Sequence, residues 1–501
     1  MRSRGIRVQS SSNADGALEG AVVVWFRLDL RLADNPALAA ATARGGTIVP
    51  VFVWAPDEDG GWPPGAASRW WLHHSLRGLD ENLRARGSRL ILRNGPSLQT
   101  LRELIRETGA MAVYWNRRYE PAARERDAAV EGALRQAGIE VRTFNSALLV
   151  EPGDLATRAG RPFQVFTPFW KAAATLEPHA PVDAPSRLPA PRRWPPGVRL
   201  DQLALLPEVD WAAGLRAAWT PGESGAHAQV RMFFDEAAGY TEARDRPGVR
   251  GTSRVSPHLH FGEISPHAVY HALQEQAAAK TWSGVVRGTE AFLRQLYWRE
   301  FAHHLLFHFP HTTDAPLNPA FREFPWRSDA KAFWLWSKGK TGYPIVDAAM
   351  RELWTIGWMH NRARMIAASF LVKDLLLPWQ QGARGFWDTL VDADLANNTL
   401  GWQWVAGCGA DAAPYFRVFN PELQSRKFDS DGAYICAWAP ELARLPDARL
   451  HAPWTAAPAE LHAAGIILGR DYPRRMVDHS EARADALAAY EVMKSQRRSK
   501  R

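Results

Sequence analysis

Residues 21–54, AVVVWFRLDLRLADNPALAAATARGGTIVPVFVW, contain two short apolar runs separated by a helical pattern. AVVVWF and TIVPVFVW are rich in β-branched and aromatic residues and almost continuously apolar, which is typical of strands buried on both faces. The segment DNPALAAATARG between them predicts a helix. A helical crossover between two such strands predicts a parallel pair covered on both sides, which is the repeating unit of a doubly wound α/β domain.

The same alternation continues to residue 150. Three further strands are predicted at RLILRNG, AVYWN and EVRTF. The helices predicted between the strands are SRWWLHHSLRGLDENLRARG, SLQTLRELIRETG and PAARERDAAVEGALRQAG. We therefore expect an α/β domain with a Rossmann-like parallel sheet at residues 20–150, preceded by a flexible N-terminus at 1–19. The turn after the first strand lacks GxGxxG, so a dinucleotide on a glycine-rich loop is not indicated there.

The remaining chain divides into three further segments. Residues 151–215 include the proline-rich passage PHAPVDAPSRLPAPRRWPPG, which disfavours helix and predicts an interdomain connector that runs over the surface. Residues 216–485 carry apolar residues at three- and four-residue spacing and predict an all-α domain. Residues 486–501 are expected to form a short, disordered basic tail.

Composition excludes several classes of protein. The 501 residues carry a net charge of +8, and five of the positive charges lie in the last eight residues, KSQRRSKR. A polyanion partner would therefore need a local basic patch. No apolar run is long enough to span a membrane, and the N-terminus lacks the apolar core of a secretory signal. The two cysteines, Cys408 and Cys436, indicate neither a disulfide framework nor a zinc ribbon, and they fit a reducing cytosol.

The segment GTSRVSPHLHFGEISP, residues 251–266, contains two Ser-Pro pairs that each predict a helix N-cap followed by proline in the first turn. Thr252, Ser253 and Ser256 place hydroxyl groups beside a helix start, where free N–H groups and the helix dipole favour an anion. Two interpretations follow, a phosphate cradle and plain helix capping. From these residues alone, capping is favoured.

The segment WMHNRARMIAASFLVKDLL, residues 358–376, predicts a helix on which Asn361 and Met365 share a face. Arginines in the first turns of a core-facing helix need an acidic partner or an anion, and Arg364 with Asp392 is a candidate pair. A solvated arginine face is the alternative. His304 and His308 are four residues apart, but no HExxH and no nearby cysteine supports a metal site, so none is expected.

The run DTLVDADLANNTLGWQWVAG, residues 388–407, combines two aspartates, two adjacent asparagines and two tryptophans. Polar groups beside large aromatic side chains need partners when they are buried. Most of the tryptophans are expected to pack in the core. Indole rings also stack on bases and are readily oxidised, which suits a protein that binds flavin and nucleic acid.

Several motifs in the same order resemble the photolyase/cryptochrome family, and the resemblance covers nearly the whole chain. The matching segments are WFRLDLRLADNPAL, GTSRVSP, FLRQLYWREF, GKTGYPIVDAAMRELWTIGWMHNRARM, DADLANNTLGWQW and GADAAPYFRVFNP. Leu28 stands where the family usually has arginine. The resemblance implies an FAD held in the helical domain, with DNA approaching the mouth of the flavin pocket.

The resemblance also implies roles for individual residues around the flavin. The positions that hold the FAD phosphates and the adjoining part of the cofactor are matched by Tyr240, Thr252, Ser253, Val255 and Ser256. Arg364 and Asp392 match an ion pair beside the isoalloxazine, Asp394 lines the same site, and Asn398 matches the residue that faces the central redox nitrogen. Asparagine at this position is typical of photolyases, whereas plant cryptochromes resemble the pattern with aspartate. The positions that match the family's photoreduction chain are Trp402, Trp379 and Trp326.

A lesion site is implied in the same way. Trp298 and Trp404 match aromatic residues that clasp a flipped pyrimidine dimer, and Arg244 matches a DNA-contacting arginine. Asn361, Arg362 and Met365 match neighbours of the dimer. Gln295 stands where many photolyases specific for cyclobutane dimers have glutamate, and it can donate and accept hydrogen bonds but carries no charge. Flipping is easier for a damaged pair, and phosphate contacts should make binding salt-dependent.

The resemblance leaves three functions to compare. The first is light-driven repair of cyclobutane pyrimidine dimers by a bacterial-type DNA photolyase, a deoxyribodipyrimidine photo-lyase that acts on UV-damaged DNA. The second is a (6-4) photolyase, but the two histidines of that class would fall at Asn361 and Met365. The third is a blue-light cryptochrome, which usually carries a long C-terminal extension that is not expected here.

A light-harvesting pigment in the α/β domain is also implied, with methenyltetrahydrofolate expected and 8-hydroxy-deazaflavin as the alternative. The candidate lining segments are PDEDGGWPPGAASRWW and YWNRRYEP. A monomer in the bacterial cytoplasm, without a membrane or an obligate protein partner, is the default expectation.

Overall fold

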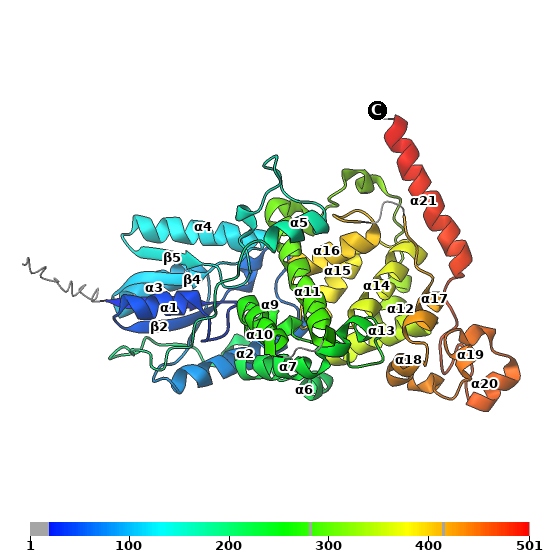
Figure 1. The fold of residues 1–501 in the computed structure, drawn as a ribbon, viewed down its shortest axis with the longest axis horizontal. Helices are drawn as coiled ribbons and strands as arrows, with labels where there is room; N and C mark the ends of the chain where they lie inside the picture. Colours follow the sequence, from blue (N-terminus) through cyan, green and yellow to red (C-terminus); the bar gives the residue numbers. More distant parts are fainter. Residues whose placement is uncertain (1–19, 280–282, 413–415, 500–501) are drawn as a thin grey trace, which may run out of the picture.

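The computed structural model describes residues 20–279, 283–412 and 416–499, so the predicted N-terminus at 1–19 lies outside the described residues. The described chain forms a parallel-sheet domain at one end of the molecule and a larger assembly of helices that extends to the other end (Figure 1). The predicted fold class, an α/β domain followed by an all-α domain, is confirmed.

The sheet has five strands in the order β3-β2-β1-β4-β5, and every pairing is parallel. All five predicted strands are present, with β1 fully buried along its length. Their bounds are β1 Ala21–Phe26, β2 Ile48–Trp54, β3 Ile91–Asn94, β4 Ala110–Asn116 and β5 Glu140–Phe144. Side chains alternate along β1, so Val22 and Val24 enter one core while Val23 and Trp25 enter another.

Helices cover both faces of this sheet, as the apolar strands require. Helices α1 (Pro36–Arg44) and α2 (Ala66–Arg84) contribute Leu38 and Trp71 to the core that contains Val22. Helices α3 (Ser97–Thr108) and α4 (Pro121–Gln136) contribute Leu101 and Leu134 to the opposite core. The domain is therefore doubly wound.

The predicted connector, residues 151–215, is more buried than a surface passage. It contains a helix, α5 (Phe166–Ala173), whose Phe166 and Phe169 enter the core beside α11, and Leu188 and Leu203 enter the core of the α/β domain. The prolines do exclude regular structure from residues 177–199. The expectation of a surface path was wrong at these side chains, because apolar residues between the prolines fill gaps in both cores.

Helices account for most of the chain from residue 213 onward. Their bounds are α6 Ala213–Ala218, α7 Glu223–Glu236, α8 Tyr240–Ala243, α9 Ser256–His260, α10 Pro266–Ala279, α11 Ser283–His308, α12 Ala330–Ser337, α13 Pro344–Ile356, α14 Asn361–Ser369, α15 Trp379–Thr389, α16 Leu395–Ala406, α17 Pro421–Phe428, α18 Ala433–Trp438, α19 Asp447–Leu450, α20 Pro458–Ala464 and α21 His479–Ser499. A π-helical turn, η7 (Phe370–Asp374), follows α14.

The predicted disordered tail is replaced by helix α21 up to Ser499, and only residues 500–501 lie outside the described part. Ala486, Ala489 and Met493 are buried in the main core of the helical domain, at spacings that place them on one helix face. Disorder was expected for 486–501 because the segment is a short basic chain end. This apolar stripe explains why the segment packs instead.

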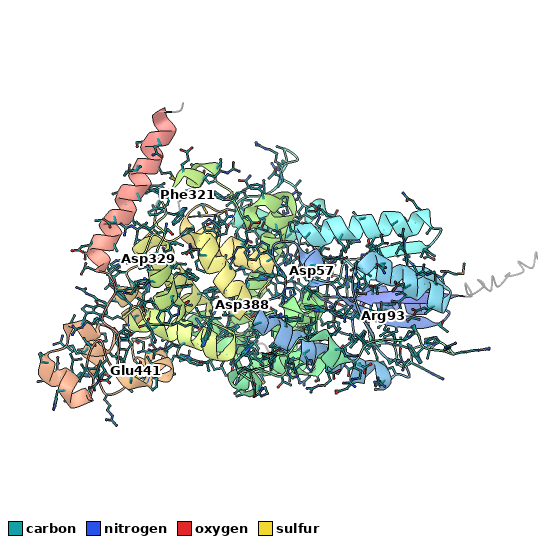
Figure 2. The ribbon with its side chains drawn as sticks, turned by 180° about the vertical axis from the view of Figure 1, so that it is seen from behind. Asp57, Arg93, Phe321, Asp329, Asp388 and Glu441 are labelled. Carbon is teal, nitrogen blue, oxygen red and sulfur yellow. The ribbon has the colours of Figure 1, made fainter. Side chains whose placement is uncertain are left out.

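The two domains are joined by buried polar contacts that cross between them. Arg31 is almost fully buried, and its guanidinium donates to the Gly262 and Ser146 carbonyls, each at 3.0 Å. Asp388 of the helical domain, labelled in Figure 2, accepts from the Ala66 amide at 3.0 Å and so caps α2. These contacts fix the helical domain against the carboxyl-terminal edge of the sheet.

Candidate functional site

Asp394 is the N-cap of α16, and its carboxylate accepts from the Asn397 amide at 2.8 Å. The other carboxylate oxygen lies 3.2 Å from Nε2 of His303 and 3.9 Å from Nδ1 of His260. Burial alone would raise the pKa of Asp394, but the two histidines lower it well below its ordinary value. The cap therefore stays ionised beneath the first turn of α16.

Arg364 and Asp392 form the predicted ion pair. Nη2 of Arg364 donates to both carboxylate oxygens at 3.0 and 2.9 Å, while Nε donates to the Met359 carbonyl at 2.7 Å. The Asp392 side chain is only 5% exposed. The alternative of a solvated arginine face is therefore wrong for Arg364.

Asn398 and Trp402 lie one turn apart on α16 and face α15. Nδ2 of Asn398 donates to the Ala383 carbonyl at 3.0 Å. Trp402 is 2% exposed, packs edge-on against Phe386 and Trp336, and has no described hydrogen-bond partner for its buried Nε1. We call the set Arg364, Asp392, Asp394, Asn398 and Trp402 the inner wall.

The other two predicted redox tryptophans follow a gradient of burial. Trp379 begins α15 and is buried in the same core as Trp402. Trp326 is half-buried and packs on Phe324. The backbone next to Trp326 is tied to the segment before Trp379, because the Arg327 amide donates to the Leu376 carbonyl at 2.8 Å.

The loop at residues 251–256 reaches the inner wall through Trp358. Nε1 of Trp358 lies 3.3 Å from Oγ of Ser256, and the Arg364 guanidinium lies 5.9 Å from the Trp358 ring. Ser253 and Val255 are buried, Thr252 is half-buried, and Tyr240 is buried nearby against Phe233 and Phe292.

The capping prediction holds for only one of the two Ser-Pro pairs. Ser265 caps α10, since its Oγ accepts from the Ala268 amide at 2.9 Å. Ser256 is instead the first residue of α9, whose N-cap is Val255. The Ser256 hydroxyl makes no capping hydrogen bond with a described residue and lies near Nε1 of Trp358 instead, and Arg254 in the preceding loop has φ +52°.

Arg254 was not predicted as a site residue. Its guanidinium lies between the rings of Trp219 and Trp358, at 4.4 and 5.0 Å. Its buried Nε and Nη2 have no hydrogen-bond partner among the described residues. Burial lowers its pKa, partly offset by the charge of Glu352. An arginine inside a hydroxyl-rich motif was the available signal, because buried donors of this kind need an acceptor such as a phosphate.

Glu352 of α13 is a second residue that sequence reasoning missed. It accepts from the Tyr434 hydroxyl at 2.6 Å and from the His360 amide at 3.1 Å, and Nδ1 of His360 caps α14 by accepting from the Arg362 amide at 3.1 Å. Burial raises the pKa of Glu352 to about 7. No local pattern marks this glutamate, whose role follows from how α13 packs on α14.

None of the predicted lesion residues is fully buried, and we call them the rim. Trp298 stacks on Phe166 with ring centroids 3.7 Å apart. Trp404 donates through Nε1 to the Asp411 carbonyl at 3.1 Å, and the Asp411 amide donates to the Gln164 carbonyl, next to Phe166 in the α5 region. The rim consists of Arg244, Gln295, Trp298, Asn361, Arg362, Met365 and Trp404.

Polar contacts connect the remaining rim residues. Nη2 of Arg244 lies 3.4 Å from Oε1 of Gln295, and Nη2 of Arg362 donates to Asp245 at 2.8 Å. Asn361 and Met365 are adjacent on α14, as predicted, with Nδ2 and Sδ 4.0 Å apart. A groove continues from Arg362 and Met365 to α21, and it is lined by basic residues that were not predicted: Arg417, Lys427 and Arg483.

A separate pocket lies at the carboxyl-terminal edge of the sheet, between the two domains. Both predicted pigment segments contribute to it, through Asp59 and Trp62 from one and Arg118 and Glu120 from the other. His260 of α9 also lines this pocket, which therefore backs onto the inner wall at Asp394. Arg118 pairs with Glu120 and Asp59, each at 3.0 Å.

The two histidines considered as metal ligands have other partners. Nε2 of His304 accepts from the Phe163 amide at 3.0 Å, and Nε2 of His308 lies 3.0 Å from the Pro152 carbonyl. Within residues 20–279, 283–412 and 416–499, no group of three or more metal-ligating side chains is found.

Comparison with known proteins identifies both domains. Residues 22–190 match the DNA photolyase domain family, and residues 292–492 match the FAD binding domain of DNA photolyase. Fold and site thus define a two-domain flavoprotein whose helical part binds FAD.

Individual relatives span nearly the whole chain. Deoxyribodipyrimidine photo-lyase of Agrobacterium fabrum is 49% identical over 476 residues, covering 94% of this chain and 98% of that protein. Cryptochrome-1 of Arabidopsis thaliana is 41% identical over 476 residues, covering 93% of this chain and 69% of that protein. A bacterial class III photolyase from Agrobacterium tumefaciens superposes with a TM-score of 0.92 at 48% identity, covering 97% of this chain and 100% of that one. The chain belongs to the photolyase/cryptochrome family.

Proposed function

We propose that this protein repairs cyclobutane pyrimidine dimers in UV-damaged DNA in a light-driven reaction, as a deoxyribodipyrimidine photo-lyase. The observation that carries the proposal is the 49% identity to a protein of that name over 94% of the chain. The rim also favours cyclobutane dimers over (6-4) photoproducts as the substrate. The two histidines typical of (6-4) photolyases would fall at Asn361 and Met365, and both are absent here.

The residues around the inner wall fit FAD. Arg254 offers buried N–H groups without described partners, and Thr252, Ser253 and Ser256 offer hydroxyls, a donor set suited to a diphosphate. Tyr240 and Val255 would line the nearby chain of the cofactor. Arg364 would supply positive charge beside the isoalloxazine, held in place by Asp392, while Asp394 fixes the start of α16. When bound and reduced, FAD supplies the light-excited electron that splits the dimer.

Three tryptophans would keep the cofactor reduced. Trp402 and Trp379 are buried and Trp326 is half-buried, so an electron hole could move outward from Trp402 to Trp326. Asn398 presents a neutral amide that cannot titrate, which favours a stable protonation state at the flavin face.

The rim would hold the flipped lesion. Trp298 and Trp404 would clasp it with their rings, and Gln295 would hydrogen-bond a pyrimidine carbonyl but could not donate a proton to it. Arg244 and Arg362 would contact phosphates, and the adjacent basic groove would extend that contact.

The interdomain pocket is the proposed site of a light-harvesting pigment, methenyltetrahydrofolate or alternatively 8-hydroxy-deazaflavin. Its lining combines the indoles of Trp25, Trp54 and Trp62 with the ion-paired side chains of Arg118 and Glu120, which suits a flat aromatic molecule with polar substituents. Acid extraction of the purified protein and the absorption spectrum of the released pigment distinguish the two candidates.

UV-damaged DNA is the proposed partner, with the protein acting as a cytoplasmic monomer. None of the described helices is long and apolar enough to cross a bilayer. Size-exclusion chromatography with light scattering, with and without dimer-containing DNA, tests the proposed stoichiometry.

Repair is tested with chemically reduced protein and an oligonucleotide that carries one thymine dimer. Blue light should restore intact thymines in more than one turnover, and a dark sample should not. The identity to cryptochrome-1 favours a photosensor as the second candidate. Binding of FAD and photoreduction without any restored thymine would support the sensor and contradict the lyase.

A further inference from the structure

Gly382 in helix α15 lies against the indole of Trp402. A Cβ atom on Gly382 would stand 2.0 Å from Cη2 of Trp402 and 2.4 Å from Cζ3, distances that real Cβ atoms do not adopt. Glycine destabilises a helix interior relative to alanine, and Gly382 has no positive φ that would require it. The close approach to Trp402 is therefore the physical reason for glycine at this position.

The next residue of α15 fixes the orientation of Asn398. The Ala383 carbonyl can only accept, so the Asn398 amide must direct Nδ2 toward it, at 3.0 Å. Oδ1 of Asn398 is thereby left at the other end of the amide as an acceptor. One turn of α15 thus contacts both inner-wall residues that face it from α16.

We propose that the Gly382–Ala383 turn is a positioning element that sets the Trp402 indole and the Asn398 amide together against the flavin. This inference rests on the proposed function. Gly382 sets how closely α15 approaches Trp402, and the same approach brings the Ala383 carbonyl within hydrogen-bonding distance of Asn398.

The surroundings of Trp402 leave little room for adjustment. Phe386 packs edge-on with its ring centroid 4.9 Å away, and Trp336 lies at 6.2 Å on another side. A methyl group at position 382 would therefore displace the indole or push α15 away from α16. Either movement changes the electron-transfer geometry of Trp402, and a shift of α15 also lengthens the contact between Ala383 and Asn398.

Gly382→Ala is the test, and Gly385→Ala is its matched control on the same helix. A Cβ at Gly385 would meet only Cζ of Phe333, at an ordinary 3.6 Å. Photoreduction of oxidised FAD is measured under blue light as a rate per bound flavin. We expect a loss on the order of tenfold to hundredfold for Gly382→Ala, the size of effect that small misplacements produce, and no change for Gly385→Ala. Equal rates in the two variants would overturn the proposal.

A double-mutant cycle measures the coupling between Gly382 and Trp402 through protein stability, independently of the flavin. Urea unfolding is measured for Gly382→Ala with Trp402 and with Trp402→Phe, whose shorter side chain lacks the clashing atoms. We expect the alanine to destabilise the first background and to be tolerated in the second. If Gly382→Ala does not fold with Trp402 present, folding of the double variant supports the proposal. Equal destabilisation or failure to fold in both backgrounds refutes it.

The two tests separate failure of this inference from failure of the proposed function. Wild-type protein that binds FAD but shows neither photoreduction nor repair contradicts the proposed function, whereas the cycle still reports whether Gly382 and Trp402 are coupled.

Discussion

Two arginines on α14 show how differently the inner wall and the rim are built. Arg364 and Arg362 are two residues apart, and each donates to an aspartate at 3.0 Å or less. The Asp392 side chain that pairs with Arg364 is 5% exposed, whereas the Asp245 side chain that pairs with Arg362 is 42% exposed. The same two chemical groups, a guanidinium and a carboxylate, therefore form a mostly buried ion pair in the inner wall and a solvated ion pair at the rim.

This difference separates two kinds of consequence. A charge left without its partner in a buried site cannot be solvated, so removing one member of the inner pair is strongly destabilising. An exposed pair contributes little to stability because water and salt screen it. We expect inner-wall substitutions to alter folding and the cofactor, and rim substitutions to alter DNA binding.

The largest expected effect separates electron supply from repair. Trp379→Phe should abolish photoreduction, because a buried phenylalanine cannot be oxidised in place of the indole. Chemical reduction of the flavin bypasses the tryptophans, so dimer repair by the dithionite-reduced variant should match wild type. The measurement is repair of a dimer-containing oligonucleotide with and without dithionite. Loss of repair in the chemically reduced sample would mean that Trp379 acts on the lesion site as well.

Arg364→Met should lower the free energy of unfolding by about 3 kcal/mol, the lower end of the range for a broken buried pair, because Arg364 is itself partly exposed. It should also reduce the FAD that copurifies with the protein. Urea denaturation and the ratio of absorbance at 450 nm to that at 280 nm check the two effects. A variant within about 0.5 kcal/mol of wild type would show that Asp392 finds another partner or is neutral.

Glu352 shows how burial of an ionisable group makes the stability of the protein depend on pH. Because burial raises its pKa from an ordinary 4.5 to about 7, the folded protein retains a proton that the unfolded chain releases between these values. The Glu352 contribution to stability is therefore present at acidic pH, falls by about 3 kcal/mol as pH rises from about 4.5 to about 7, and is constant above that.

Glu352→Gln removes this ionisation, so the difference in unfolding free energy between wild type and variant measures it. The neighbouring charges of Arg254, Arg364 and His360 are present in both proteins and largely cancel in that difference. A pH-independent difference between pH 4.5 and 7.5 would contradict the raised pKa of Glu352.

The smallest expected effect on stability lies at the rim. Arg362→Met should change the free energy of unfolding by less than about 1 kcal/mol, because Asp245 is solvated. Loss of one phosphate contact should reduce the slope of log affinity against log salt by about 0.9 for duplex DNA. Fluorescence anisotropy at several salt concentrations measures the slope, with Arg199→Met as a control in a pair that is exposed at both members. An unchanged slope would remove Arg362 from the DNA contact.

Local sequence pattern was sufficient for the sheet. Each run that predicted a strand corresponds to one of β1 to β5. The central strands β1 and β2 are continuously apolar because they are buried on both faces. Local sequence pattern did not predict the two helices whose formation depends on tertiary packing. Helix α5 and helix α21 are stabilised by Phe166 and Met493, which enter cores built by distant segments.

The candidate site was predictable to a different degree. Arg364 and Asp392 could be paired from the sequence, since an arginine in a core-facing helix needs an acid. The contacts of Asn398 with Ala383 and of Trp402 with Gly382 could not, because they depend on the separation and rotation of α15 and α16. Glu352 was missed for the same reason, since its partner Tyr434 lies far away in the chain, whereas the hydroxyl-rich motif around Arg254 was itself a signal.

The backbone carbonyls around Arg31 have a consequence for the proposed light-harvesting pigment. The guanidinium is held by backbone oxygens of Asp34 and Ser146 in the α/β domain and of Gly262 in the helical domain, so a hinge motion would remove the Gly262 acceptor from a buried cation. Energy transfer between two chromophores depends on their separation and on the angle between their transition dipoles. A pigment seated at the sheet edge would keep both quantities constant relative to the flavin, and its transfer efficiency should be insensitive to solvent viscosity.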